Sequence, residues 1–218
     1  TAQTRCQVGI ARGDITPPIG IYHRMWGAAT HERATGVHLP LTATLLWLEP
    51  ESGDLSQAVV IATFDHCLID CSDISLMRAA ISTAAGIAAD QVQIAVSHTH
   101  GAGLMSRTRA SLPGGELIAP YLDDLADKLA ELTKAAAKSQ QSATIVYGSG
   151  RCKLAGHRDY FDAARQRFVC GLNPSGPADD TVIVGKIAAD DGATLGTIVN
   201  YACHPTTLAW QRSEEHTS

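Results

Sequence analysis

The chain has 218 residues, of which 45% are hydrophobic and 18% charged, and its formal net charge is −5. This composition predicts a packed core and argues against disorder. An acidic chain without a basic run argues against nucleic acid as the main partner. No apolar run reaches the roughly 20 residues of a transmembrane helix, and no signal segment opens the chain. The chain does not begin with Met, which fits either a processed protein or a fragment.

Apolar runs bounded by glycine, proline and acidic residues predict strands along the whole chain. We expect strands at residues 7–11, 41–49, 57–65, around Ile94, and at 143–148, 181–187 and 195–203. The strands at 41–49 and 57–65 are separated by a turn, so they can form a hairpin. Asp190-Asp191-Gly192 predicts a second hairpin between the last two strands.

Two helices are expected between these strands. The first covers residues 73–88, with Ser72 or Asp73 as its N-cap. The second covers residues 120–137 and has one apolar face, made by Leu122, Leu125, Leu129 and Leu132. The first helix lies between two predicted strands, and this β-α-β order allows those strands to be parallel neighbours. The order of elements predicts an α/β fold.

Three segments are not expected to be regular strands or helices, and the first of them, 21–36, has no clean periodicity. Segment 104–119 is expected to be a long loop, and segment 150–177 is rich in polar and turn residues. Segment 21–36 mixes aromatic residues with His23 and His31, and it is either a binding loop or a flexible arm. Aromatic side chains are unusual in disordered chains, which favours the binding loop.

Histidines stand where two apolar strands end. His98 and His100 follow the strand around Ile94, and His204 follows the last predicted strand. Residues i and i+2 of a strand point to the same face, so His98 and His100 could bind a metal together, or one could bind metal while the other handles protons. Three converging histidines would suit zinc. The alternative is that these are exposed loop histidines without a common role.

The six cysteines are dispersed, and none forms a Cys-x-x-Cys pair. A zinc ribbon or a disulfide scaffold is therefore not expected. Cys67 and Cys71, four residues apart, are either a redox or metal pair or small buried or half-buried thiols, and we favour the second interpretation. Cys67 belongs to Asp65-His66-Cys67, which sits at the carboxyl end of a strand, a favoured place for site residues. No Gly-x-Ser-x-Gly elbow, dinucleotide fingerprint or P-loop is present.

Several stretches, in order along nearly the whole chain, resemble the N-terminal domain of neutral/alkaline non-lysosomal ceramidases and their bacterial relatives. They are Gly13-Asp14-Ile15-Thr16-Pro17-Pro18, Gly36-Val37-His38, Ser97-His98-Thr99-His100-Gly101-Ala102-Gly103, Arg158 within residues 154–159, residues 173–180, and Asn200-Tyr201-Ala202-Cys203-His204-Pro205-Thr206. The resemblance implies a layered α/β/β/α-type catalytic domain, incomplete here, with mixed sheets and flanking helices. Where typical ceramidases have Ser after the second motif histidine, this chain has Gly101-Ala102-Gly103.

The resemblance also implies a reaction, because the family contains zinc-dependent amidases that split ceramide into sphingosine and fatty acid. It implies that His98 and His204 are metal ligands for Zn²⁺. It makes His100 and Arg158 catalytic, with His100 beside the substrate or the zinc-bound water and Arg158 holding substrate oxygen as a fixed cation. The family's other ligands, a Glu and a Tyr, lie further along than this sequence extends, so the fragment itself is expected to be inactive.

Two other functions stay open from the sequence. One is a zinc hydrolase of a non-lipid amide or ester, and the other is a non-catalytic binding module that retains the fold. The expected partner is a small-molecule or lipid amide, with peripheral contact with membrane lipid and no nucleic acid. The resemblance favours a secreted or periplasmic location, although the sequence leaves the compartment open.

The last seven residues, Arg212-Ser213-Glu214-Glu215-His216-Thr217-Ser218, match the translation of a widely used sequencing-library adapter. We therefore expect residues 1–211 to be the N-terminal part of the ceramidase-like catalytic domain and 212–218 to be an adapter-derived tail, which is excluded from functional argument.

Overall fold

A computed structural model describes residues 2–25 and 31–205, so the predicted adapter-derived tail lies outside the described residues. The helices are α1 (Cys71–Ala85) and α2 (Ile118–Lys138). The strands are β1 (Gln3–Asp14), β2 (Thr42–Glu49), β3 (Val59–Phe64), β4 (Leu68–Ile69), β5 (Val92–Val96), β6 (Leu104–Met105), β7 (Gln141–Arg151), β8 (Asp159–Asp162), β9 (Arg167–Cys170), β10 (Thr181–Ala189) and β11 (Thr194–Tyr201).

Seven strands form one mixed sheet in the order β11-β10-β7-β1-β2-β3-β5. The predicted hairpin of β2 with β3 is confirmed by their antiparallel pairing, and so is the hairpin of β10 with β11. The predicted parallel neighbours are β3 and β5, joined through α1. The α/β class is thus confirmed, with a mixed sheet and two flanking helices.

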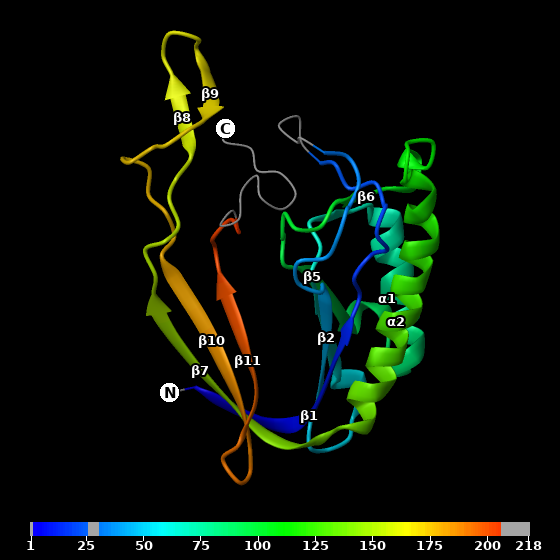
Figure 1. The fold of residues 1–218 in the computed structure, drawn as a ribbon. Helices are drawn as coiled ribbons and strands as arrows, with labels where there is room; N and C mark the ends of the chain where they lie inside the picture. The colour runs from blue at the N-terminus through cyan, green and yellow to red at the C-terminus, as the bar shows by residue number, and fades with distance from the viewer. Residues whose placement is uncertain (1, 26–30, 206–218) are drawn as a thin grey trace.

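The sheet bends along β1, whose two ends pair with different strands. β1 pairs with β7 through Gln3 to Val8, and with β2 from Gln7 onward. The result is two facing arms, one of β7, β10 and β11 and the other of β1, β2, β3 and β5, with both helices on the outside of the second arm (Figure 1). A cavity of about 560 Å³ lies between the arms.

The main core lies between the helices and the second arm. Leu122, Leu125 and Leu129 of α2 are each 1% exposed or less, which confirms the predicted apolar face. The close approach of α2 to β1 requires a glycine, because a Cβ at Gly9 would lie 1.9 Å from the carbonyl oxygen of Ala136. A smaller cluster around Val8 and Ile145 fills the base where the two arms meet.

One local prediction was wrong. Helix α1 begins at Cys71, after Asp70, so neither Ser72 nor Asp73 is its N-cap. Asp73 instead lies in the first turn of the helix, where it is buried and its carboxylate accepts a hydrogen bond of 2.7 Å from Nε of Arg107. Segment 150–177, which is rich in polar and turn residues, contains the short antiparallel hairpin β8–β9. Within the described residues no helix is long and apolar enough to cross a membrane.

Candidate metal centre

The predicted histidines come from opposite edges of the sheet. His98 and His100 follow β5 and His204 follows β11, and these are the last and first strands of the seven. Six strand spacings in a flat sheet would separate those edges by about 29 Å. In the bent sheet the ring centroids lie 5.2 Å apart for His98 and His100, 5.0 Å for His98 and His204, and 4.7 Å for His100 and His204. The bend therefore assembles the cluster.

The sequence pattern predicts that His98 and His100 share one face of a strand, but in the structure they do not. Strand β5 ends at Val96, and the backbone of His98 has a φ of 56°, in the left-handed region that non-glycine residues rarely adopt. The two histidines lie in the loop that follows the strand. It is this loop, and not strand alternation, that brings both imidazoles to the same place.

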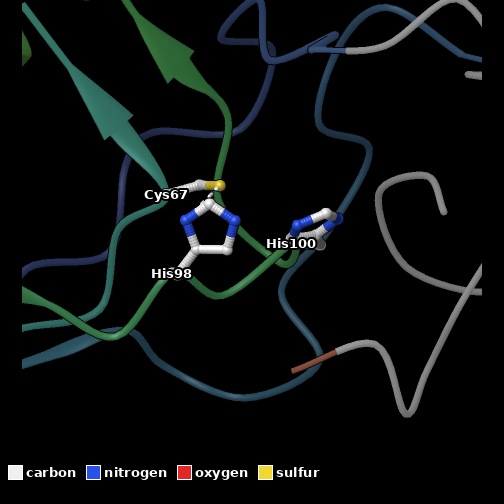
Figure 2. A group of neighbouring side chains, drawn as sticks. All are labelled: Cys67, His98 and His100. Carbon is white, nitrogen blue, oxygen red and sulfur yellow. Dashed lines mark hydrogen bonds between the residues drawn. The ribbon is translucent and has the colours of Figure 1, made fainter. Parts of the chain in front are cut away.

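Cys67 is the residue whose role in this cluster the sequence analysis did not assign. Its Sγ lies 3.6 Å from Nδ1 of His98, and one ligand atom from each of Cys67, His98 and His100 lies within 4.8 Å of the others (Figure 2). Cys67 follows β3 and His98 follows β5, so adjacent parallel strands bring them together. The sequence feature that could have identified Cys67 is its position in Asp65-His66-Cys67, at the carboxyl end of a strand. Cys71, its suggested partner, is exposed at the start of α1 and lies outside this group.

A buried hydrogen-bond network holds the Cys67 loop. The hydroxyl of Tyr121 on α2 donates to the carbonyl of Ile15 at 2.8 Å and lies 2.6 Å from Nε2 of His66. Because the tyrosine proton is used, Nε2 of His66 carries the proton of that second bond. Burial lowers the pKa of His66 to about 4 and raises the pKa of Tyr121, so both groups are neutral near pH 7.

Asp65 anchors the start of the same loop. Its carboxylate accepts hydrogen bonds of 2.9 Å from the backbone N–H and 3.0 Å from the hydroxyl of Thr42. The backbone N–H of Asp65 in turn donates to the carbonyl of Thr42. The loop that carries Cys67 is thus fixed on one side by β2 and on the other by α2.

Arg158, predicted from the sequence, reaches the cluster from just before β8. It donates a hydrogen bond to Nδ1 of His204, and Nε2 of His204 lies 2.8 Å from Nε2 of His100. Arginine can only donate, so Nδ1 of His204 accepts and, in the neutral ring, Nε2 of His204 carries the proton. His204 then donates to His100, and a directional chain runs from Arg158 through His204 to His100.

The cluster fits a zinc ion in donor type and spacing. Two imidazoles on one tetrahedral zinc have ring centres about 5.2 Å apart, since each centre lies about 3.2 Å from the metal. The three observed separations, 4.7–5.2 Å, agree with this. The 2.8 Å between the Nε2 atoms of His100 and His204 is a hydrogen bond, whereas two nitrogens on one zinc would be about 3.3 Å apart.

No protein-family model matches the sequence, and no curated protein matches it. Two solved structures are similar in fold. One is described as "Ceramidase complexed with C2", with a TM-score of 0.74, 17% identity, and coverage of 97% of this chain and 33% of that one. The other is described as neutral ceramidase from Pseudomonas aeruginosa, with a TM-score of 0.71, 14% identity, and coverage of 99% of this chain and 34% of that one. The chain spans about a third of the length of these structures, and across that third it has the fold of a neutral ceramidase.

Proposed function

We propose that this chain carries part of the active site of a zinc-dependent amide hydrolase of the neutral ceramidase type, which splits an N-acylsphingosine into sphingosine and a fatty acid. One observation carries the proposal: the rings of three histidines from the two arms of the sheet lie 4.7–5.2 Å apart, and ligand atoms of Cys67, His98 and His100 lie within 4.8 Å of one another. The fold shared with ceramidases supports the same reaction class.

The chain's own residues divide into candidate metal ligands and candidate catalytic residues. His98 and His204 would hold zinc, and Cys67 is a further candidate ligand because its sulfur faces His98. When bound, zinc would supply a Lewis acid that polarises a carbonyl and lowers the pKa of bound water to about 7. His100, 5% exposed, would accept a proton from the attacking water and pass it to the leaving amine.

Arg158 would stabilise the negative charge that develops on the amide carbonyl oxygen. At present it donates to Nδ1 of His204. That hydrogen bond keeps the guanidinium beside the histidine cluster, where it could also donate to a substrate oxygen.

Contact with a lipid surface is part of the proposal. The hairpin β8–β9 projects at one end of the molecule (Figure 1). It exposes apolar side chains: Tyr160, Phe161, Phe168 and the following Leu172 are 45–79% exposed. Aromatic side chains insert readily into the interfacial region of a bilayer. Arg158 immediately precedes this hairpin, so a lipid-bound hairpin would lie beside the reacting groups.

Metal content tests the ligand assignment. Purified chain is dialysed against defined free Zn²⁺, and bound zinc is measured by mass spectrometry for the wild type, His98→Ala and His204→Ala. His157→Asn is the control, because it removes a histidine outside the cluster. Each ligand variant should bind zinc at this site at least tenfold more weakly. The loss of a residue that only supports a ligand already lowers metal affinity by roughly 10-fold or more, and a ligand itself should matter at least as much. Equal zinc in wild type and His98→Ala would instead favour the binding module.

Substrate class needs a second assay. The resemblance implies a Glu and a Tyr ligand beyond these residues, so the 218-residue chain should show no amide hydrolysis, and turnover by it would contradict this ligand set. A longer clone that supplies both ligands is assayed on a ceramide and on short acyl amides in parallel. Preference for the short amides would replace the ceramidase assignment with a non-lipid hydrolase.

A further inference from the structure

A second group of histidines lies outside the candidate metal centre. A cavity of about 340 Å³ is lined by His23, His31 and the segment 34–38, which ends at His38. Three of the chain's nine histidines therefore face one cavity. None of the residues that line it belongs to the group of Cys67, His98 and His100.

Backbone pairing brings two of these histidines together. The N–H of Gly20 donates to the carbonyl of Ala34 at 2.8 Å, and the N–H of Ala34 donates to Ile21 at 3.0 Å. The N–H of His23 donates to the carbonyl of Glu32 at 2.9 Å. These bonds align two antiparallel segments. As a result the ring centroids of His23 and His31 lie 5.0 Å apart, close to the about 5.2 Å expected for two histidines on one tetrahedral metal.

One buried imidazole nitrogen of this cavity lacks a hydrogen-bond partner among the described residues. His23 is 8% exposed, and its Nε2 makes no hydrogen bond within residues 2–25 and 31–205. A buried polar atom without a partner is costly, so such atoms are rare unless a ligand, ion or water completes them. The backbone of His23 is held in place, because Gly103 packs against it so closely that a Cβ there would lie 2.6 Å from the Cα of His23.

We propose that His23 and His31, with His38 of the same cavity lining drawn in as a third ligand, bind a second divalent transition-metal ion, Zn²⁺ above all. Imidazole suits zinc, copper and nickel, whereas magnesium and calcium take oxygen ligands. Among the described residues, the cavity lining includes no aspartate or glutamate, so its donors favour the first class. The ion would tie residues 20–25 and 31–38 to one another beside the loop at Gly103, soon after His100, and so would be structural rather than catalytic.

The test separates the two metal sites by substitution in the 218-residue chain. His98→Ala with His204→Ala disables the first site, and His23→Asn with His31→Asn disables the second. Bound zinc per chain is measured after dialysis at defined free Zn²⁺ for the wild type, each double variant and the quadruple variant. His157→Asn is the control for loss of a histidine elsewhere. Circular dichroism and urea unfolding verify that each variant is folded.

The first double variant should still bind close to one zinc per chain, and the quadruple variant should bind at least tenfold more weakly. Equal zinc binding by the first double variant and the quadruple variant overturns the proposal. His38→Asn changes an exposed side chain and should not affect folding. It should lower zinc affinity in the His98→Ala, His204→Ala background by roughly tenfold, and unchanged affinity would remove His38 from the site. The readout is zinc alone, so it does not depend on amidase activity.

Discussion

Replacing Tyr121 by Phe should destabilise the fold strongly although it removes a single oxygen atom. That hydroxyl serves two fully buried groups, the imidazole of His66 and the carbonyl of Ile15. Phenylalanine would leave the Nε2–H of one and the carbonyl oxygen of the other without a partner. Each unsatisfied buried group costs about 1–3 kcal/mol, so we expect a loss of roughly 2–4 kcal/mol from the free energy of unfolding. Typical domains have only about 5–15 kcal/mol in total.

Urea unfolding of the metal-free chain measures this loss, provided that the slope against urea concentration is unchanged. Tyr147→Phe is the matched control, because Tyr147 is 40% exposed and should change stability by less than about 0.5 kcal/mol. A double-mutant cycle with His66→Leu should show a coupling energy between residues 66 and 121 of about 0.5–3 kcal/mol. If Tyr121→Phe matches the control, the buried network does not hold the Cys67 loop as argued.

Three other outcomes are expected. The pKa of His66 is lowered from 6.5 to about 4 in the native chain. Between these two pH values the histidine is therefore protonated in the unfolded chain but neutral in the native chain. Stability of the metal-free chain should therefore fall by about 2 kcal/mol between pH 7 and pH 5 from this group, and urea titrations of His66→Leu should lack most of that fall. Gly9→Ala would place a Cβ 1.9 Å from a helix carbonyl and should cost about 1–3 kcal/mol or more, whereas Gly148→Ala, with open space around it, should cost little in the same unfolding assay. Replacing Phe161 and Phe168 by Ser should reduce the fraction of chain that sediments with phospholipid vesicles, and an unchanged fraction would exclude this hairpin as the lipid contact.

Features written in local sequence were predictable. Apolar runs with clear turns located the seven strands of the large sheet, although β1 and β7 are longer than their apolar centres. The leucine spacing located α2, since helical periodicity survives whatever the helix packs against. His98, His100, His204 and Arg158 were all singled out, and the structure brings all four together.

Features that depend on distant contacts were not predictable in the same way. Cys67 is four residues from Cys71 in sequence, but its neighbour in space is His98, in the loop after the adjacent strand. The N-cap of α1 was misplaced because the helix begins at Cys71, which leaves Asp73 inside the first turn, where it pairs with Arg107 from far along the chain. The strands β8 and β9 span four residues each, too few for a period-2 pattern to stand out from the surrounding turns.

The bend of the sheet explains why the strands were predictable from local sequence while the meeting of the histidines was not. His98 and His204 each end a recognisable strand, but their meeting depends on β1 leaving β7 near Val8 and continuing beside β2. At that point Gly9 lets α2 press its backbone onto β1, which fixes the second arm against the helices. The first arm then places His204 over His98 and His100. A substitution that straightens β1 should therefore move His204 away from His98 and His100 without replacing any histidine. The geometry of the metal centre depends on the curvature of the sheet as well as on the side chains that form it.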